Sequence, residues 1–129
     1  MRWVISEHGM DMTLSREVPE KVGGVVRGFV TELLSRAGLG LRDLSRAALA
    51  VHPGGPRIID GVRASLEASE EQVRFSRQVL FDYGNMSSAT LPHVWMRMLE
   101  SDDVASGTPI VSLAFGPGLT VCGAVLKKQ

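Results

Sequence analysis

The chain has only one cysteine, Cys122, and this scarcity excludes an intrachain disulfide framework and a multi-cysteine zinc site. It has no excess of charge of either sign, because 14 Lys and Arg residues balance 14 Asp and Glu residues. Binding to nucleic acid or to an anionic membrane without specificity depends on excess positive charge, so we expect neither. The longest purely aliphatic run, residues 47–51, is far shorter than the ~20 residues of a membrane-spanning helix. With no signal-type stretch at the start, these absences favour a reducing, cytoplasmic location.

What the chain does contain is the composition of one globular domain. Its 129 residues are enough for one domain and too few for two ordinary ones. Hydrophobic residues make up 44% and charged residues 22%, a balance that a folded domain has and a disordered tail lacks. The glycines gather at positions 54–55, 84, 116 and 118, where we expect the chain to turn, and at positions 23–24, inside a predicted helix, where we expect them to allow close packing on a neighbouring backbone.

The first forty residues predict a hairpin and a long helix. Residues 3–5 and 10–14 predict one strand or a short hairpin with His8 and Gly9 in its turn. Apolar residues then recur every three or four positions up to Gly38, which is typical of a helix that ends at a glycine. The apolar stripe of this helix consists of Val18, Val22, Val25, Val26, Phe29, Leu33 and Leu34.

The middle of the chain predicts a strand followed by three helices. Residues 47–51 form an unbroken apolar run, which is typical of a strand covered on both faces. Pro56 can begin the first helix, and the second begins after Ser69, which is spaced from Gln72 as in a capping box. A third helix is expected to end near Glu100. The inward positions of the first two helices are Ile58, Ile59, Val62, Leu66, Val73, Val79, Leu80 and Tyr83, and the capping candidates of the third are Ser87, Ser88 and Thr90.

Two strands are expected at the end of the chain, at residues 110–115 and 119–126, joined by a Gly-Pro-Gly turn. Strands that alternate with helices and end in a strand pair predict the α/β fold class, with a mixed sheet covered by helices in α/β/α layers. Cys122 lies in the last strand and is expected in the core, not as a nucleophile. His8 and His93 have no carboxylate or cysteine at ligand spacing, so we expect no metal site.

The segment His-Pro-Gly-Gly-Pro, residues 52–56, follows the predicted buried strand. In open α/β sheets ligands bind outside the carboxyl ends of the strands, so His52 is a candidate cleft residue. Gly54 and Gly55 allow a ligand to approach the backbone, and the free amides at the start of the next helix attract an anionic or carbonyl oxygen. The alternative is a histidine that only stabilises a turn by bonding to the backbone. The segment itself leaves both interpretations open.

The segment Gly-Asn-Met-Ser-Ser-Ala, residues 84–89, joins two predicted helices. The side-chain amide of Asn85 is a neutral donor that can polarise a carbonyl or stabilise an oxyanion. The alternative is purely structural, because asparagine tolerates a left-handed backbone and serine caps helices. A third segment, Phe-Gly-Pro-Gly-Leu at residues 115–119, is a rigid turn that needs no function of its own.

In this order the three segments resemble the type III polyketide synthases, the chalcone and stilbene synthase family of the thiolase fold. The resemblance covers essentially the whole chain and implies a thiolase-like half-domain. It implies that His52 and Asn85 are two members of a Cys-His-Asn catalytic triad that acts on an acyl-CoA starter and malonyl-CoA without a cofactor. It also implies that Gly54, Gly55 and Arg57 border a pantetheine tunnel, that Ser87 lines the polyketide cavity, that Phe115, Gly116, Pro117 and Gly118 shape cyclisation, and that Met12 stands at the cavity mouth.

Some features depart from the family pattern. The catalytic cysteine of the family lies in an N-terminal half, which is absent here, so residues 1–129 correspond to a C-terminal domain alone. Cys122 follows the Gly-Pro-Gly turn and does not correspond to the nucleophile. Ala114 stands where the family usually has glycine. Pro92 stands where it usually has an aliphatic residue, and a proline there favours a helix that starts at Thr90.

We therefore expect the C-terminal half of a type III polyketide synthase. It would contribute a histidine and an asparagine to the decarboxylative condensation of malonyl-CoA, an acyltransferase chemistry, and would be inactive without a cysteine-bearing half. An uncovered apolar face predicts self-association or a partner that carries the N-terminal half. The alternative, from another class, is a stand-alone binding, regulatory or remnant domain that keeps the fold without turnover.

Overall fold

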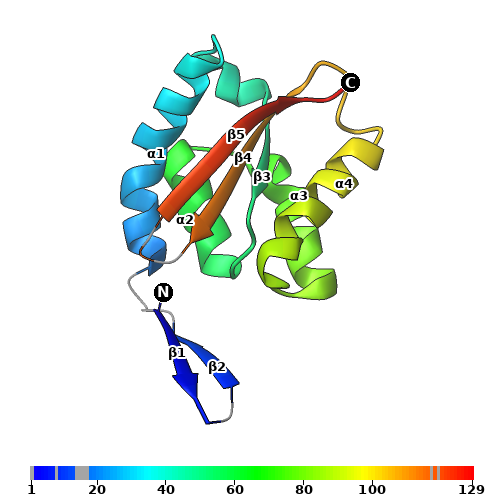
Figure 1. Ribbon diagram of the computed structural model, residues 1–129. Coiled ribbons are helices and arrows are strands. Elements are labelled where there is room, and N and C mark those ends of the chain that lie inside the picture. The colour runs from blue at the N-terminus through cyan, green and yellow to red at the C-terminus, as the bar shows by residue number, and fades with distance from the viewer. Residues whose placement is uncertain (1, 8, 14–17, 117, 119) are drawn as a thin grey trace.

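The computed structural model describes residues 2–7, 9–13, 18–116, 118 and 120–129, and for residues 2–6, 9–13 and 18–20 it describes the backbone alone. The predicted helices and strands are present to within a few residues, and the short 3₁₀ helix η1 is an element that no periodic pattern predicts (Figure 1). The elements are β1 (Arg2–Ser6), β2 (Gly9–Thr13), α1 (Val18–Arg36), η1 (Leu41–Arg46), β3 (Ala48–Val51), α2 (Pro56–Leu66), α3 (Glu70–Tyr83), η2 (Ser87–Ala89), α4 (Thr90–Glu100), β4 (Pro109–Gly116) and β5 (Thr120–Lys127).

A three-stranded sheet in the order β3-β4-β5 forms the centre of the molecule. β3 pairs with β4 in parallel, with Leu49 opposite Val111, and β4 pairs with β5 in antiparallel, with Val111 opposite Val125. A parallel pair needs a long crossover connection, which α2, α3 and α4 supply, whereas the short connection between Gly116 and Thr120 allows only an antiparallel pair. The mixed α/β sheet that the sequence predicts is therefore confirmed.

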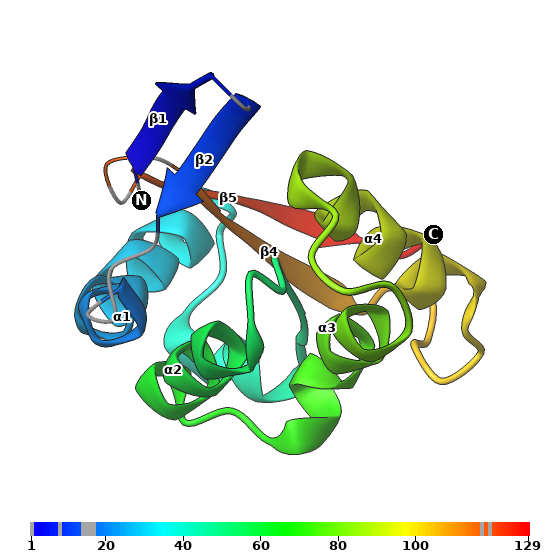
Figure 2. The same cartoon turned by 90° about the horizontal axis from the view of Figure 1, so that it is seen from below.

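Helices cover both faces of this sheet (Figure 2). Successive side chains of a strand point to opposite faces, so Leu49 and Val51 of β3 join one core cluster while Ala50 joins the other. The cluster with α1 and α2 includes Val22, Val26, Val30, Leu34, Ile59, Val62, Val111 and Leu113, and the cluster with α3 and α4 includes Phe75, Val79, Leu91, Val94, Met98 and Ile110. The layers are those of an α/β/α domain.

The buried sides of α1 and α3 differ from the predicted ones. Val25 of α1 is 46% exposed, whereas Val30, which the predicted stripe omits, is fully buried. The buried residues of α1 repeat every four positions because one ridge of the helix packs against α2 and the sheet. Tyr83 of α3 is 53% exposed, which corrects its predicted inward position, and Phe75 is buried on that helix instead.

Glycines permit the close approach of α1 to its neighbours. A Cβ atom at Gly123 of β5 would lie 2.8 Å from the Phe29 ring and 2.9 Å from the Leu33 side chain, so any larger residue would collide with α1. At Gly23 the backbone of α1 lies against α2, and the Gly23 carbonyl accepts a 2.7 Å hydrogen bond from the Ser65 hydroxyl. These contacts hold α1 against both β5 and α2.

A buried serine of α3 closes the outer edge of β3. The Ser76 hydroxyl accepts a 3.0 Å hydrogen bond from the Val51 amide and donates to the Leu49 carbonyl at 3.5 Å. Ser76 is fully buried, so water cannot take its place as the partner of these two backbone groups. The bonds satisfy backbone groups that an open edge strand would leave unpaired.

Gln72 has two functions at the start of α3. Its side-chain oxygen accepts from the Ser69 amide at 3.0 Å while the Ser69 hydroxyl accepts from the Gln72 amide, which confirms the predicted capping box. Its side-chain nitrogen donates to the carbonyls of Leu44 and Ala47 at 2.7 and 2.9 Å. The same side chain therefore caps α3 and ties it to the segment that leads into β3.

The first two strands pair in antiparallel, with Trp3 opposite Met12, so the hairpin interpretation of this region is confirmed. In Figure 1 the hairpin extends away from the helices and the three-stranded sheet. His8 of the predicted turn lies outside the described residues.

Cys122 is exposed, which corrects the prediction that it lies in the core. It belongs to β5, an edge strand whose residues are all partly or fully exposed. The apolar composition of β5 suggests a buried strand, but α1 packs on only one of its faces. No helix in the described part of the chain is long and apolar enough to cross a membrane.

Candidate active site

The three motif segments gather at one end of the sheet. His52 follows β3, and Phe115 and Gly116 end the neighbouring parallel strand β4, so these residues lie at the carboxyl ends of the two strands (Figure 1). The junction between α3 and α4 reaches the same place, because the Asn85 side-chain nitrogen donates to the Gly54 carbonyl at 3.4 Å. Thus the two candidate catalytic segments are in direct contact, although 31 positions separate Gly54 from Asn85 in the sequence.

The backbone of His52 is fixed, while its ring is left without a partner among the described residues. The His52 amide donates to the Leu113 carbonyl at 2.8 Å, and the His52 carbonyl accepts from the Gly54 amide at 2.9 Å. The ring is partly buried, and this burial lowers the pKa of His52 below its ordinary value because it disfavours the charged form. A neutral imidazole has one N–H donor and one acceptor nitrogen, which suits donation to a carbonyl oxygen.

Asn85 is held in a tight turn by its own side chain. Its side-chain oxygen accepts from the Ser87 amide at 2.9 Å, which leaves the side-chain nitrogen directed to Gly54. Because a backbone N–H can only donate, the atom that faces Ser87 must be the oxygen, so the orientation of the amide is determined. The left-handed residue of this turn is Ser87, with φ of 58°, and not asparagine as the structural alternative proposes.

The hydroxyl residues of this junction do not cap α4 in the expected manner. Ala89 is the N-cap residue of α4, and no side chain bonds to the helix start there. α4 does begin at Thr90, as Pro92 predicts. The Thr90 hydroxyl instead bonds to the preceding turn, where it accepts from the Met86 amide and donates to the Ser87 carbonyl, both at 2.8 Å.

The other predicted site residues on the His52 side are accessible. Gly54 lies beside the His52 ring, at a distance where a Cβ would make ordinary contact, and Gly55 is the N-cap residue of α2. Arg57 is exposed in the first turn of α2 and makes no hydrogen bond or ion pair with the described residues. Its guanidinium is therefore available to an anionic ligand at this end of the sheet.

The turn after β4 is described in part. Phe115 is half-buried against the cluster under α1 and α2, and Gly116 ends β4 opposite Thr120. Gly118 has φ of +69°, a conformation that favours glycine, and Pro117 lies outside the described residues. Met12 lies in β2, and only its backbone is described. The structure thus brings together His52, Gly54 and Asn85, and does not place the side chain of Met12.

Aromatic and charged side chains of α3 and α4 contact one another across the two helices near their junction. The rings of Tyr83 and His93 lie with their centroids 5.6 Å apart, and the Arg97 guanidinium lies 5.4 Å from the Tyr83 ring. The His93 Nδ1 is 2.9 Å from the Ala89 carbonyl. A ring pair across two helices has no sequence signal, because the spacing of ten residues belongs to no periodic pattern. In the described part of the chain, no three metal-ligating side chains gather.

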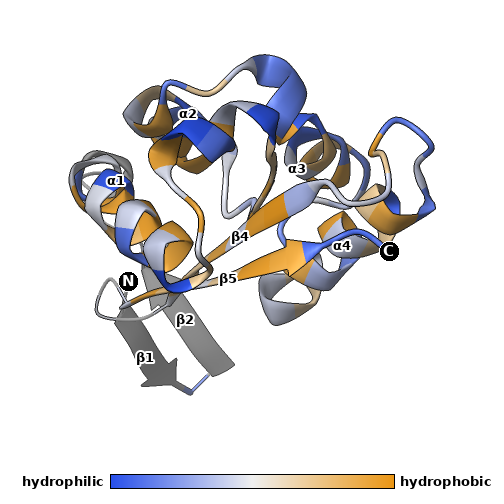
Figure 3. Ribbon diagram, turned by 90° about the horizontal axis from the view of Figure 1, so that it is seen from above, coloured by the Kyte–Doolittle hydropathy of each residue, from blue (hydrophilic) through white to orange (hydrophobic). Residues whose placement is uncertain are grey.

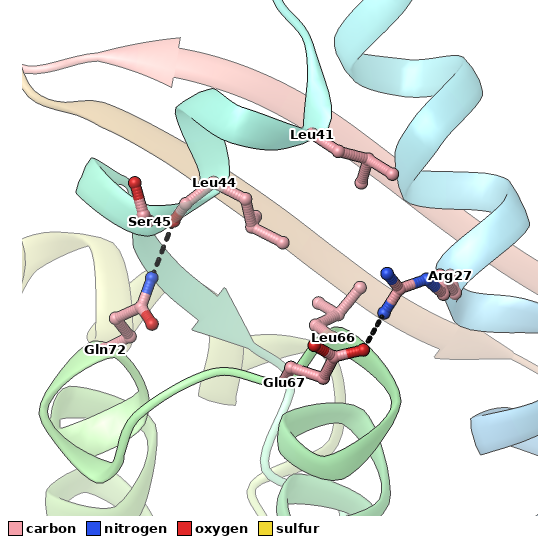
Figure 4. A pocket seen from close by; sticks show the side chains of 7 residues that line it. All are labelled: Arg27, Leu41, Leu44, Ser45, Leu66, Glu67 and Gln72. Atoms are coloured by element: carbon pink, nitrogen blue, oxygen red, sulfur yellow. Dashed lines mark hydrogen bonds and ion pairs between the residues drawn. The ribbon is translucent and has the colours of Figure 1, made fainter.

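A separate cavity of about 200 Å³ lies at the opposite end of β3 (Figure 4). Part of its wall is formed by η1, which directly precedes β3, and by the end of α2. An ion pair of 2.8 Å between Arg27 and Glu67 crosses it. Its lining consists of Arg27, Leu41, Leu44, Ser45, Leu66, Glu67 and Gln72. None of the predicted site residues takes part in it.

Cys122 is not positioned as a partner of His52. It pairs with Ala114 of β4, and Ala114 follows Leu113, which bonds to the His52 backbone. β4 therefore lies between the backbones of Cys122 and His52, and at ordinary strand spacing these backbones are about 10 Å apart. A thiolate and an imidazole that share a proton need to lie within hydrogen-bond distance.

Comparison with known proteins agrees with this architecture. The model of the family "Chalcone and stilbene synthases, C-terminal domain" matches residues 1–129. Type III polyketide synthase C of Arabidopsis thaliana is 36% identical over 126 residues, and type III polyketide synthase 21 of Oryza sativa subsp. japonica is 35% identical over 127. Both alignments cover 95% of this chain, but the chain spans only about a third of the length of these relatives, 33% and 32%.

Solved structures show the same fold. The C-terminal type III polyketide synthase domain of Steely1 from Dictyostelium superposes with a TM-score of 0.89 and 30% identity, over 98% of this chain and 35% of that one. The polyketide synthase PKS-I of the brown alga Ectocarpus siliculosus superposes with a TM-score of 0.88 and 30% identity, over 99% of this chain and 35% of that one. The α/β half-domain is thus thiolase-like, and the chain belongs to the chalcone and stilbene synthase family, of which it matches the C-terminal domain.

Proposed function

We propose that this chain supplies the histidine and the asparagine of a type III polyketide synthase active site, and that the nucleophilic cysteine comes from outside residues 1–129. The observation that carries the proposal is the contact between Asn85 and Gly54, which joins the two motif segments at the carboxyl end of β3. The exposed position of Cys122, across β4, supports a nucleophile from outside the described residues.

The proposed reaction begins with acyl transfer. The thiolate of the nucleophilic cysteine attacks the carbonyl of a starter acyl-CoA and expels the CoA thiolate. Malonyl-CoA then loses its carboxylate as CO₂, and the electron pair of the broken C–C bond forms the enolate of acetyl-CoA. The enolate carbon attacks the enzyme thioester, and collapse of the tetrahedral intermediate releases the cysteine thiolate and a β-ketoacyl-CoA.

His52 and Asn85 would stabilise the oxyanions of these steps. Both are neutral N–H donors in this chain, because burial lowers the pKa of His52 and an amide carries no charge. Donors that are already oriented stabilise developing charge without reorganisation. A thiolate placed next to His52 would favour the imidazolium and so raise the pKa of His52 again. The exposed guanidinium of Arg57 suits the phosphates of CoA.

The surface of α4 and β5 supports a protein partner. Met96, Leu99 and Leu126 are 53%, 55% and 41% exposed, and β4 and β5 are hydrophobic over much of their length (Figure 3). The Lys128 ammonium donates to the Ser101 carbonyl, so the end of β5 lies beside the end of α4. A neighbouring group of exposed apolar side chains is typical of an interaction surface. We propose that the cysteine-bearing half, or a second copy of the chain, covers it. A cytoplasmic location is part of this proposal.

A non-catalytic binding or remnant domain is the second candidate. Its support is that β4 separates Cys122, the single cysteine of residues 1–129, from His52. Such a domain would keep the fold and the Asn85 contact, but no partner would convert it into an enzyme.

A chimera distinguishes the two. The C-terminal third of Arabidopsis type III polyketide synthase C is replaced by this chain, and CO₂ release from malonyl-CoA is measured. We expect decarboxylation by the chimera and a loss of at least about a hundredfold in His52→Gln and in Asn85→Ala. His93→Gln and Gln78→Ala are matched controls that should retain activity. A folded chimera without decarboxylation, or one indifferent to both substitutions, would favour the non-catalytic domain.

A further inference from the structure

Thr90 is a fully buried polar residue that bonds to both sides of the turn after Asn85. Its hydroxyl oxygen accepts from the Met86 amide at 2.8 Å. Its single proton is directed to the Ser87 carbonyl at 2.8 Å, and the Asn85 side-chain oxygen lies 3.4 Å away. One hydroxyl therefore contacts three consecutive residues of the turn, Asn85, Met86 and Ser87.

This turn depends on an external constraint. Ser87 has φ of 58°, a left-handed conformation that costs free energy for a residue with a side chain. The amide of the same residue donates to the Asn85 side-chain oxygen at 2.9 Å. Removal of the Thr90 hydroxyl would leave the Met86 amide without its acceptor and the Ser87 carbonyl with the Thr90 backbone amide as its remaining donor, which would loosen the turn.

We propose that Thr90 is a positioning residue for Asn85, and that its buried hydroxyl keeps the Asn85 side-chain nitrogen directed to the Gly54 carbonyl. Thr90 itself is fully buried, so any effect on a ligand would act through Asn85. Its effect on catalysis rests on the proposed function, whereas its effect on the Asn85 amide does not.

The composition of the chain permits a direct test, because Asn85 is its only asparagine. In protein labelled with ¹⁵N only at asparagine, the NMR spectrum holds one side-chain amide pair. We expect two dispersed resonances in the native chain and in Thr90→Ser, which keeps the hydroxyl. In Thr90→Val the pair should collapse to the shifts of a free asparagine. Val94→Ala, in the same helix, is the control for lost stability, because Val94 is fully buried and its side chain has no group that could hydrogen-bond to the turn.

An unchanged pair in Thr90→Val would overturn the proposal, as would equal changes in Thr90→Val and Val94→Ala. If Thr90→Val does not fold, Thr90→Ser and Thr90→Ala form a second comparison, since both lack the methyl group and differ in the hydroxyl. In the chimera, Thr90→Val should lower kcat about tenfold to a hundredfold with little change in KM, and Thr90→Ser should restore it. If the amide pair responds as expected while Asn85→Ala leaves decarboxylation intact, the positioning stands and the proposed function fails.

Discussion

His52 donates its backbone amide to the Leu113 carbonyl at 2.8 Å, so the candidate catalytic histidine continues the hydrogen-bond ladder of β3 and β4. A residue placed by a sheet has a fixed backbone, while its ring remains available because it bonds to none of the described residues. Precise placement of a free side chain is what a preorganised donor requires. Because the ring is partly buried, the stability of the folded chain should depend on pH.

Stability should rise with pH through the titration of His52. Burial lowers the pKa of His52 in the folded chain below 6.5, so the unfolded chain binds more protons between the two pKa values. The free energy of unfolding should therefore fall as the pH drops from about 7 through this window. Urea denaturation at a series of pH values measures the slope, and His52→Gln should make it shallower. A His52 ring proton that titrates above 6.5 in NMR would contradict this prediction.

Gly123→Ala should destabilise the fold by about 1–3 kcal/mol. The new Cβ would lie within 2.9 Å of Phe29, Leu33 and the Ser112 carbonyl, and backbone cannot move aside as a flexible side chain can. Gly24→Ala in α1 is the matched control. Nothing lies within 4 Å of a Cβ there, so it should stabilise the helix by up to about 1 kcal/mol. Thermal or urea unfolding measures both, and equal stability of the two variants would disprove the close contact between β5 and α1.

Ser76→Ala should cost about 1–3 kcal/mol, because it leaves the buried Val51 amide without an acceptor. Hydrogen exchange of the Val51 amide should accelerate by more than the loss of global stability explains. Ser106→Ala, at an exposed position of the loop before β4, should change stability by less than about 0.5 kcal/mol. Unchanged exchange at Val51 would mean that α3 does not close this edge of β3.

Cys122 should behave as an accessible thiol without a catalytic role. Because it is exposed, it should react with a disulfide reagent in the native chain nearly as fast as in urea. Cys122→Ser should leave the stability and the decarboxylation of the chimera unchanged. Acylation of Cys122 by an acyl-CoA, followed by product release, would reverse the assignment of the nucleophile to a partner.

The isolated chain should self-associate through α4 and β5. Leu99→Glu should weaken this association in sedimentation experiments, because it introduces a charge among Met96, Leu99 and Leu126 without disturbing the core. Phe81→Glu is the control, since Phe81 is 89% exposed on α3. A monomeric native chain at high concentration, or an equal effect of both variants, would locate the interaction elsewhere.

Local chemistry is enough to predict most of the elements of this fold. The Ser69–Gln72 capping box, the apolar run of β3 and the strand pair on either side of the Gly-Pro-Gly segment each depend on a few residues, and the structure confirms them. The motif order likewise predicts the family, which the match over residues 1–129 shows. The roles of His52 and Asn85 in catalysis remain predictions.

Contacts between distant segments decide the rest. Periodicity treats Val25, Tyr83 and Cys122 as apolar or inward positions, but which side of a helix or strand is covered depends on where its neighbours pack. The Thr90 hydroxyl suggests a helix cap in the sequence, and only the folded turn shows that it binds Met86 and Ser87 instead. The contact of Asn85 with Gly54 arises because α2 and α3 return the chain to the carboxyl end of β3. Hydrogen bonds and van der Waals forces act over a few ångströms of space, so sequence separation alone does not reveal which groups they join.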